Sequence, residues 1–162
     1  MKKLTKSKNI KILLTDVDGV LTDGGMYYTP TGDTIKKFHA RDGMGVNLLK
    51  KSEIPTIIVT KEKTKMVKNW AKKMNISYVY DGIQEKEKIL PEICKKYSVT
   101  SSQIAYVGDD VNDIGLLKKV GFSATPNDGI MDAQNIVDYV CKKKGGDGVL
   151  REIADIILHN ID

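Results

Sequence analysis

The stretch "LLTDVDGVLTDGG" occupies residues 13–25 and places three aspartates and three glycines directly after an apolar run. The apolar residues are typical of a buried strand. A single carboxylate at a strand end is often a turn residue, but Asp16, Asp18 and Asp23 lie within eight positions and point to a cation, a proton or a phosphate. The stretch therefore predicts both the first strand of the fold and the place of a chemical site.

The 162 residues suit one domain with its own core, over 1–162, with 41% apolar and 29% charged residues. No run reaches the roughly 18 apolar residues of a membrane span. The basic N-terminal segment lacks the apolar core and cleavage site of a signal peptide. Cys94 and Cys141 have no metal-like spacing. We expect a cytoplasmic protein that has reduced thiols and no membrane partner.

The net charge of +5 comes with 26 basic residues, of which only Arg41 and Arg151 are arginines. The lysines are dispersed over predicted helix faces, with no basic run interleaved with aromatic residues and no zinc-finger or RNP pattern. We therefore expect no nucleic-acid partner. The basic excess would mildly attract an anionic substrate.

Apolar runs of strand length alternate with segments of helical periodicity. The runs lie at 9–16, 54–60, 76–81, 103–109, 121–126 and 136–141. Helical stripes lie at about 42–51, 66–74, 89–97, 116–120 and 150–157, with Asp42 as the expected N-cap of the first and Trp70 as a core residue of the second. The alternation predicts a doubly wound, Rossmann-like α/β domain with a parallel sheet covered on both faces.

Two segments stand outside this alternation. Residues 24–40 have strand-like arms around a turn at 29–33, which predicts a β-hairpin flap inserted after the first strand. At the other end, a tail over about 142–162 carries the glycine-rich stretch 145–148 and then Arg151. A glycine-rich tail followed by an arginine suggests anion binding, and a salt bridge at a helix start is the alternative.

Polar residues follow four of the predicted strands, and the carboxyl ends of parallel strands meet at one edge of the sheet. These residues are Asp16 and Asp18, then Thr60, then Lys86, then Asp109, Asp110 and Asp113. They match what phosphoryl transfer through an aspartyl-phosphate needs. One carboxylate attacks phosphorus and a second moves the proton. A hard cation such as Mg²⁺ offsets charge repulsion, while a lysine and a hydroxyl hold phosphate oxygens.

The strings "DVDGVLTD" and "GDDVND", with Thr60 and Lys86 between them, resemble in order and spacing the four motifs of the haloacid dehalogenase (HAD) phosphatase superfamily. The resemblance implies that Asp16 is the nucleophile and a Mg²⁺ ligand. It implies that Asp18 is the general acid and base and binds the metal through its backbone carbonyl. The remaining implied roles are metal binding by Asp109, phosphate binding by Thr60 and Lys86, and support of Lys86 or the metal by Asp113 and Asp110.

Lys86 follows Thr60 by only 26 residues, which leaves no room for a cap domain. The strings "TDGGMYYTPTGDTIKKFHARDGMGV" and "KKKGGDGVLREI" resemble the capless subgroup of sugar-acid phosphatases. This resemblance implies a homotetramer in which the hairpins pack together and the tail reaches a neighbouring active site. Arg41 would form a surface salt bridge or pair with a substrate carboxylate; Asp42 and Arg151 join it as substrate-binding candidates.

The segment after Thr60 resembles one branch of this subgroup. Glu62, and Lys73 eleven residues on, are similar to a pair in the enzymes that act on phosphates of nine-carbon 2-keto-3-deoxy acids, KDN-9-phosphate and N-acetylneuraminate-9-phosphate. Lys61 stands where that branch has a glycine. The expected substrate is therefore one of these two, with the eight-carbon KDO-8-phosphate as the alternative.

Two readings of another class remain. A signal-receiver domain also gathers carboxylates, a threonine and a lysine around an aspartyl-phosphate, but its phosphorylated aspartate ends the third strand. The candidate nucleophile in this chain, Asp16, ends the first. A non-catalytic HAD module is the other reading, and the presence of every required carboxylate argues against it.

Overall fold

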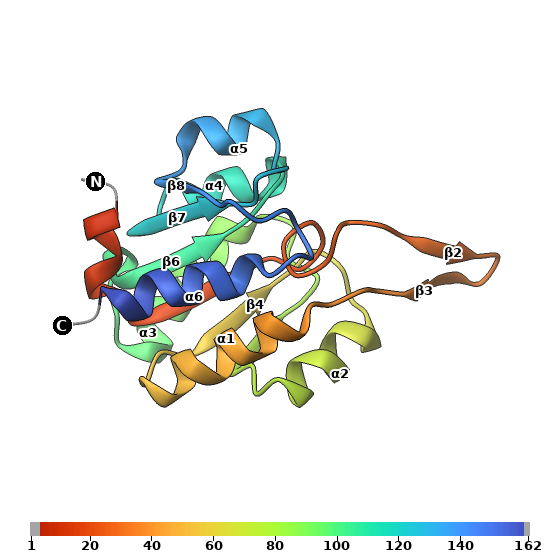
Figure 1. Cartoon of the computed structure of the whole chain (residues 1–162), viewed down its shortest axis with the longest axis horizontal. Coiled ribbons are helices and arrows are strands. Elements are labelled where there is room, and N and C mark those ends of the chain that lie inside the picture. The colour runs from red at the N-terminus through yellow and green to blue at the C-terminus, as the bar shows by residue number, and fades with distance from the viewer. Residues whose placement is uncertain (1–3, 161–162) are drawn as a thin grey trace.

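The computed structural model describes residues 4–160 and has a six-stranded sheet in the order β5-β4-β1-β6-β7-β8 (Figure 1). All neighbouring strands in it are parallel. The strands are β1 (Ile12–Thr15), β4 (Thr56–Val59), β5 (Tyr78–Tyr80), β6 (Ile104–Val107), β7 (Phe122–Thr125) and β8 (Tyr139–Val140). Each lies within one of the six apolar runs, so the predicted parallel α/β fold is confirmed.

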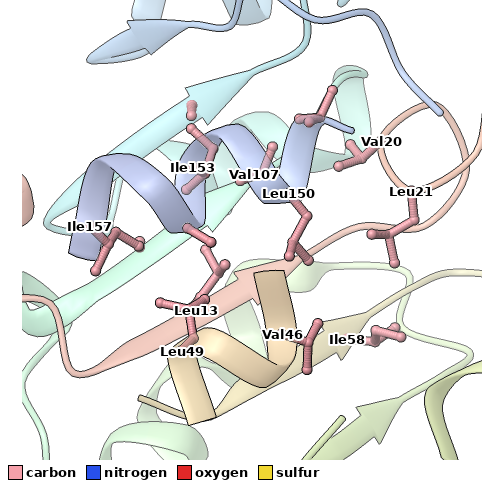
Figure 2. Packing of buried hydrophobic residues seen from close by; sticks show 14 of the residues in the cluster. Leu13, Val20, Leu21, Val46, Leu49, Ile58, Val107, Leu150, Ile153 and Ile157 are labelled. Atoms are coloured by element: carbon pink, nitrogen blue, oxygen red, sulfur yellow. The ribbon is translucent and has the colours of Figure 1, made fainter. Parts of the chain in front are cut away.

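The helices cover both faces of the sheet because successive strand side chains point to opposite sides. The helices are α1 (Ala40–Lys51), α2 (Lys65–Lys73), α3 (Leu90–Tyr97), α4 (Ile114–Leu117), α5 (Met131–Ile136) and α6 (Val149–His159). Leu13 of β1 belongs to the core cluster of α1, α2 and α6, whereas its neighbours Ile12 and Leu14 belong to that of α3, α4 and α5. Figure 2 shows Leu49 of α1 and Ile153 of α6 among the residues over β1. None of the helices described is long and apolar enough to cross a membrane.

The helix α5 was not anticipated. It has six residues, and only Ala133 among them is buried, so it shows no apolar stripe of helical period. The run predicted as a strand, 136–141, includes Ile136, which is the last residue of α5. The strand β8 begins only at Tyr139. Each of the five predicted helical stripes overlaps a helix, and the one at 116–120 runs past the end of α4 at Leu117.

The predicted hairpin is present and projects from the body of the domain (Figure 1). Its strands are β2 (Tyr27–Thr29) and β3 (Gly32–Ile35), which are antiparallel. Gly32 has φ of 118°, a conformation that other residues rarely adopt, and it follows the turn at 30–31. Tyr27 and Tyr28 are exposed on the hairpin. No cap domain is present in the described part of the chain, where the hairpin alone stands between β1 and α1.

The expectation that Asp42 is the N-cap of α1 was wrong. The helix begins at Ala40, and the cap is His39, whose Nδ1 accepts a hydrogen bond from the N–H of Arg41 at 3.2 Å. Asp42 is fully buried in the first turn and accepts the N–H of Arg151, at the start of α6, at 2.9 Å. Asp42 therefore satisfies an end group of the neighbouring helix and joins α1 to α6.

Asp42 also makes stability depend on pH. Burial raises the pKa of its carboxyl to about 7, from an ordinary value of 3.8, although the N–H of Arg151 opposes the shift. Between these two values the folded chain holds a proton that the unfolded chain releases. The contribution of this group to the free energy of unfolding is therefore greatest below about pH 4 and is lost as the pH rises to about 7.

We expect the difference in unfolding free energy between the wild type and Asp42→Asn to fall as the pH rises through this window, because asparagine does not titrate. Urea unfolding at several pH values from 4 to 8 measures this difference. Asp132→Asn, at an exposed position in α5, is the control and should run parallel to the wild type. A parallel profile for Asp42→Asn would contradict the assignment.

Candidate active site

The site lies where β1, β4 and β6 end. A cavity of about 140 Å³ opens there, and side chains that follow all three strands line it. The lining residues are Asp16, Asp18, Met26, Thr60, Lys61, Glu62, Asp109, Asp110 and Asn112. The structure thus brings together the residues predicted after the first, second and fourth strands along the chain, although they are up to 94 positions apart.

Lys86 does not line the cavity itself but contacts Asp16, which does. It begins the short 3₁₀-helix Lys86–Ile89 that leads into α3, and its side chain is fully buried. Its Nζ lies 2.8 Å from Oδ1 of Asp16 and 2.6 Å from Oδ1 of Asp113. Burial alone would lower the pKa of Lys86, but the two carboxylates outweigh it and raise that pKa. The ammonium group therefore stays charged between two acidic partners.

Asp113 contacts both Lys86 and the backbone after β6. Its role in support of Lys86 or the metal stays a prediction. Its Oδ2 accepts the N–H groups of Asp109 at 2.8 Å and Asp110 at 3.1 Å, and its Oδ1 also accepts the hydroxyl of Tyr106. At Gly108 an added Cβ would lie 2.5 Å from the Asp113 side chain, so this close approach needs glycine. Asp110 is exposed, and its Oδ1 accepts the N–H of Val111 at 2.6 Å.

The carboxylates form a cluster that fits a divalent cation. Asp16, Asp109 and Asp113 each offer an oxygen, and these oxygens lie within 4.8 Å of one another. Oδ1 of Asp109 is buried without a hydrogen-bond partner. Burial, with the charges of Asp16 and Asp113, raises the pKa of Asp109 to about 8. A cation with oxygen ligands would supply the missing partner and offset this repulsion.

Asp16 lies in the same field. Burial is the main cause that raises its pKa to about 7, Asp113 adds to it, and Lys86 opposes it. Both oxygens of Asp113 accept hydrogen bonds, whereas Asp16 meets Lys86 through Oδ1 alone and Oδ1 of Asp109 has no partner. This agrees with the prediction that Asp16 and Asp109 are metal ligands, which stays a prediction. An added Cβ at Gly19 would lie 2.0 Å from Oδ2 of Asp109, so glycine lets the loop after β1 approach that ligand.

Asp18 lines the cavity. Its carboxylate is not among the three whose oxygens lie within 4.8 Å of one another. Its Oδ1 pairs instead with Nζ of Lys36, at 2.6 Å. Lys36 follows β3 at the base of the hairpin. The nucleophile candidate and the acid–base candidate therefore have separate lysine partners, Lys86 and Lys36.

The substrate-binding candidates are only partly brought to this cavity. Glu62 lines it, but Lys73 is exposed at the far end of α2. Arg41 and Arg151 line another cavity, of about 630 Å³, beside α6. Nε of Arg151 pairs with Asp155 at 2.8 Å, one turn along its helix, which agrees with the salt-bridge alternative.

Asp42, the remaining substrate-binding candidate, is buried between α1 and α6 and lines neither cavity. Asp23, which the sequence left without a role, belongs to the hairpin base. Its Oδ1 accepts the N–H of Gly25 at 3.0 Å, and its Oδ2 lies 3.4 Å from Nζ of Lys37.

The described part of the predicted tail folds onto its own domain. Gly146 donates its N–H to the carbonyl of Val20 at 3.0 Å, and an added Cβ at Gly145 would lie 2.1 Å from the carbonyl oxygen of Gly19. Five residues of α6 are buried, so this helix is part of the core. Residues 145–148 therefore brace the loop that carries Asp16 and Asp18; contact with a neighbouring subunit stays a prediction.

Sequence reasoning did not single out Met26 in the cavity lining, nor Tyr106 and Lys36, which contact the carboxylates of the site. A tyrosine in a buried strand needs a partner for its hydroxyl, so the position of Tyr106 in the apolar run "QIAYVGD" was a usable sign. Lys36 is one of many lysines, and its role depends on how the chain returns from the hairpin.

Known proteins share this fold and these motifs. A model of the haloacid dehalogenase-like hydrolases matches residues 50–153. The 3-deoxy-D-manno-octulosonate 8-phosphate phosphatase KdsC of Haemophilus influenzae is 37% identical over 153 residues, which are 94% of this chain and 85% of that protein. KdsC of Escherichia coli K12 is 35% identical over 159 residues, 96% of this chain and 82% of that protein.

Solved structures agree with these relatives. The cobalt-bound phosphatase from Haemophilus influenzae has a TM-score of 0.92 at 36% identity, and the match covers 96% of this chain and 91% of that one. The Moraxella catarrhalis enzyme, solved with a magnesium ion, a phosphate ion and KDO, has a TM-score of 0.95 at 34% identity and covers 99% and 92%. The chain belongs to the haloacid dehalogenase-like hydrolase family, and it is a phosphoric monoester hydrolase.

Proposed function

We propose that the protein is a Mg²⁺-dependent phosphatase of a 2-keto-3-deoxy sugar acid, with KDO-8-phosphate as its substrate. The observation that carries the proposal is the buried pairing of Asp16 with Lys86 beside a cavity that Asp18, Thr60 and Asp109 also line. The chain has a nucleophile, an acid–base group, phosphate ligands and a metal cluster around one space. The 8-phosphate phosphatases of KDO among its relatives support the choice of substrate.

The first step uses residues on opposite sides of the scissile bond. Lys86 holds Oδ1 of Asp16 at 2.8 Å and leaves the other oxygen to attack phosphorus. As the new bond to Asp16 forms, the bond to the sugar oxygen breaks, and Asp18 gives that oxygen its proton. Thr60 and Lys86 hold the phosphoryl oxygens. Asp16 and Asp109 would hold Mg²⁺, which would supply positive charge that offsets the repulsion between the carboxylates and the phosphate.

The second step returns the enzyme to its starting state. Asp18 has become a carboxylate and takes a proton from the water that attacks phosphorus. The bond between phosphorus and Asp16 breaks, and inorganic phosphate leaves. Turnover of this kind separates the proposal from a receiver-like module, which would hold its phosphate.

The names of the two KdsC relatives specify the eight-carbon acid and so do not support the expectation of a nine-carbon substrate. The pair on which it rests, Glu62 and Lys73, does not meet in this cavity, because only Glu62 lines it. KDO-8-phosphate, which was the alternative, is therefore the better proposal.

Assembly is a further part of the proposal. Met26, Tyr27, Tyr28 and Ile35 expose between 55% and 70% of their surface on the hairpin, and a patch of this kind favours association. We propose a cytoplasmic homotetramer in which hairpins pack together. Light scattering of the purified protein measures the assembly state.

Substitution of Asp109 tests the metal cluster without an activity assay. In a metal-free sample, Asp109→Asn removes one of three crowded carboxylates and should raise the melting temperature. Mg²⁺ should stabilise the wild type, by about 2.7 kcal/mol at a hundredfold excess over its Kd, and should leave Asp109→Asn unchanged. Calorimetry with and without Mg²⁺ measures both effects. Asp110→Asn changes the exposed neighbouring residue and should still be stabilised by Mg²⁺. If Mg²⁺ stabilised Asp109→Asn but not Asp110→Asn, the ligand assignment would be contradicted.

A phosphate-release panel tests the reaction and its substrate. We expect kcat/KM for KDO-8-phosphate to exceed those for KDN-9-phosphate and N-acetylneuraminate-9-phosphate by at least about tenfold, a difference of roughly 1.4 kcal/mol in transition-state binding. Asp16→Asn should abolish release from all three, because it removes the attacking carboxylate. Asp132→Asn is the matched control. Equal or better rates on a nine-carbon acid would refute the choice of substrate, and an inactive wild type would refute the enzyme proposal.

A further inference from the structure

We propose that Lys36, at the base of the hairpin, is a positioning residue for the acid–base carboxylate of Asp18. The proposal rests on the proposed phosphatase function. Nζ of Lys36 lies 2.6 Å from Oδ1 of Asp18, and the two residues are 18 positions apart. The Lys36 side chain is 2% exposed and that of Asp18 is 26% exposed. A charge-assisted hydrogen bond of this length in a water-poor setting restricts the orientation of the carboxylate.

The path of the chain explains why Lys36 points inward. Residues 36–39 run from the hairpin to α1 without helical structure. Phe38 stacks on Trp70 of α2, with ring centroids 4.6 Å apart and an interplanar angle of 12°. Exposure alternates along this segment, because Lys36 and Phe38 are half-buried while Lys37 between them has a side chain that is 63% exposed. The ring stack therefore anchors the segment that presents the ammonium to Asp18.

The neighbouring pair shows by contrast what is special about Lys36. Nζ of Lys37 is 3.4 Å from Oδ2 of Asp23, and both side chains are well exposed. An exposed pair of this kind contributes little to stability or order. The two successive lysines therefore differ in their surroundings. The side chain of Lys36 is buried against Asp18, whereas that of Lys37 is in water.

The contact assigns separate tasks to the two oxygens of Asp18. With Oδ1 held by Lys36, Oδ2 is the oxygen that carries the proton to the sugar oxygen as the bond from that oxygen to phosphorus breaks. Asp18 then has a carboxylate that keeps its contact with the ammonium and takes a proton from water in the next step. Lys36 contacts Asp18 at 2.6 Å, and in this proposal it acts through that carboxylate and not on the substrate.

Leaving-group dependence tests this role. A sugar alkoxide needs the proton from Asp18 to depart, whereas 4-nitrophenolate is stable enough to leave without one. In Lys36→Met we expect the single-turnover rate of sugar release from KDO-8-phosphate to fall by about tenfold or more, which is a part of the hundredfold or greater effect of general acid catalysis, and the single-turnover rate of 4-nitrophenol release to fall less than about twofold. Hydrolysis of phosphorylated Asp16 follows both release steps and does not enter these rates. The enzyme concentration that gives half the maximal rate should stay unchanged for both substrates.

The controls are built into the chain and into the assay. Lys37→Met makes the same replacement one residue along and should leave both rates unchanged. The ratio of the two single-turnover release rates is read from one preparation, so partial unfolding affects both measurements and leaves the ratio alone. Lys36→Gln keeps a hydrogen-bond donor and should lower the ratio less than Lys36→Met; it also provides the test if the methionine variant does not fold.

The outcomes separate this proposal from the one beneath it. A wild type that hydrolyses neither substrate would remove the phosphatase proposal itself. An active wild type whose two rates fall equally in the Lys36 variants would overturn the positioning role alone. A higher half-saturating enzyme concentration for the sugar phosphate, with its maximal single-turnover rate unchanged, would also overturn it, because that result would make Lys36 a substrate ligand.

Discussion

The buried ammonium of Lys86 is placed between Asp16 and Asp113, and the arrangement of the site depends on it. The carboxylates there are close enough that burial and mutual repulsion raise the pKa values of Asp16 and Asp109. Lys86 opposes both shifts, and it also fixes one oxygen of Asp16 and one of Asp113. Without this cation, Asp113 would be a buried charge that retains only neutral partners. The lysine therefore keeps together a group of acidic residues that would otherwise separate or take up protons.

The fold makes such crowding tolerable because the polar residues all follow the strands of a parallel sheet. Hydrophobic side chains on both faces of β1 support the loop that carries Asp16 and Asp18. Residues 145–148 pack on the same loop through Gly145 and Gly146. Glycine occurs at these contacts because a side chain would meet backbone atoms closer than any real contact permits. Packing on both sides would keep the proposed catalytic carboxylates in place before substrate or metal arrives.

The sequence was sufficient for the strands and for the residues that follow them, and less so for everything that depends on packing between distant segments. Apolar runs of strand length identify the sheet, and parallel topology then brings Asp16, Thr60 and Asp109 to one edge. The sequence of a first helical turn does not show which neighbouring element its side chains will contact. The sequence therefore predicts Asp42 as the cap of its own helix, although it contacts α6. The spacing between Glu62 and Lys73 says nothing of where α2 ends relative to the cavity. Tyr106 was within reach of the sequence, but Lys36 needed the path of the chain.

The hairpin has a second consequence for a chain that has no cap domain in its described residues. Met26, before β2, lines the catalytic cavity, and Lys36, after β3, contacts Asp18. Both ends of the hairpin therefore take part in the site, while its tip carries exposed tyrosines away from the body (Figure 1). A partner docked on the tip, as proposed for the tetramer, would contact the same hairpin whose base contacts the proposed acid–base carboxylate. Under these two proposals, association and catalysis would be linked through a short stretch of chain, and the stack of Phe38 on Trp70 would limit how far movement of the hairpin displaces Lys36.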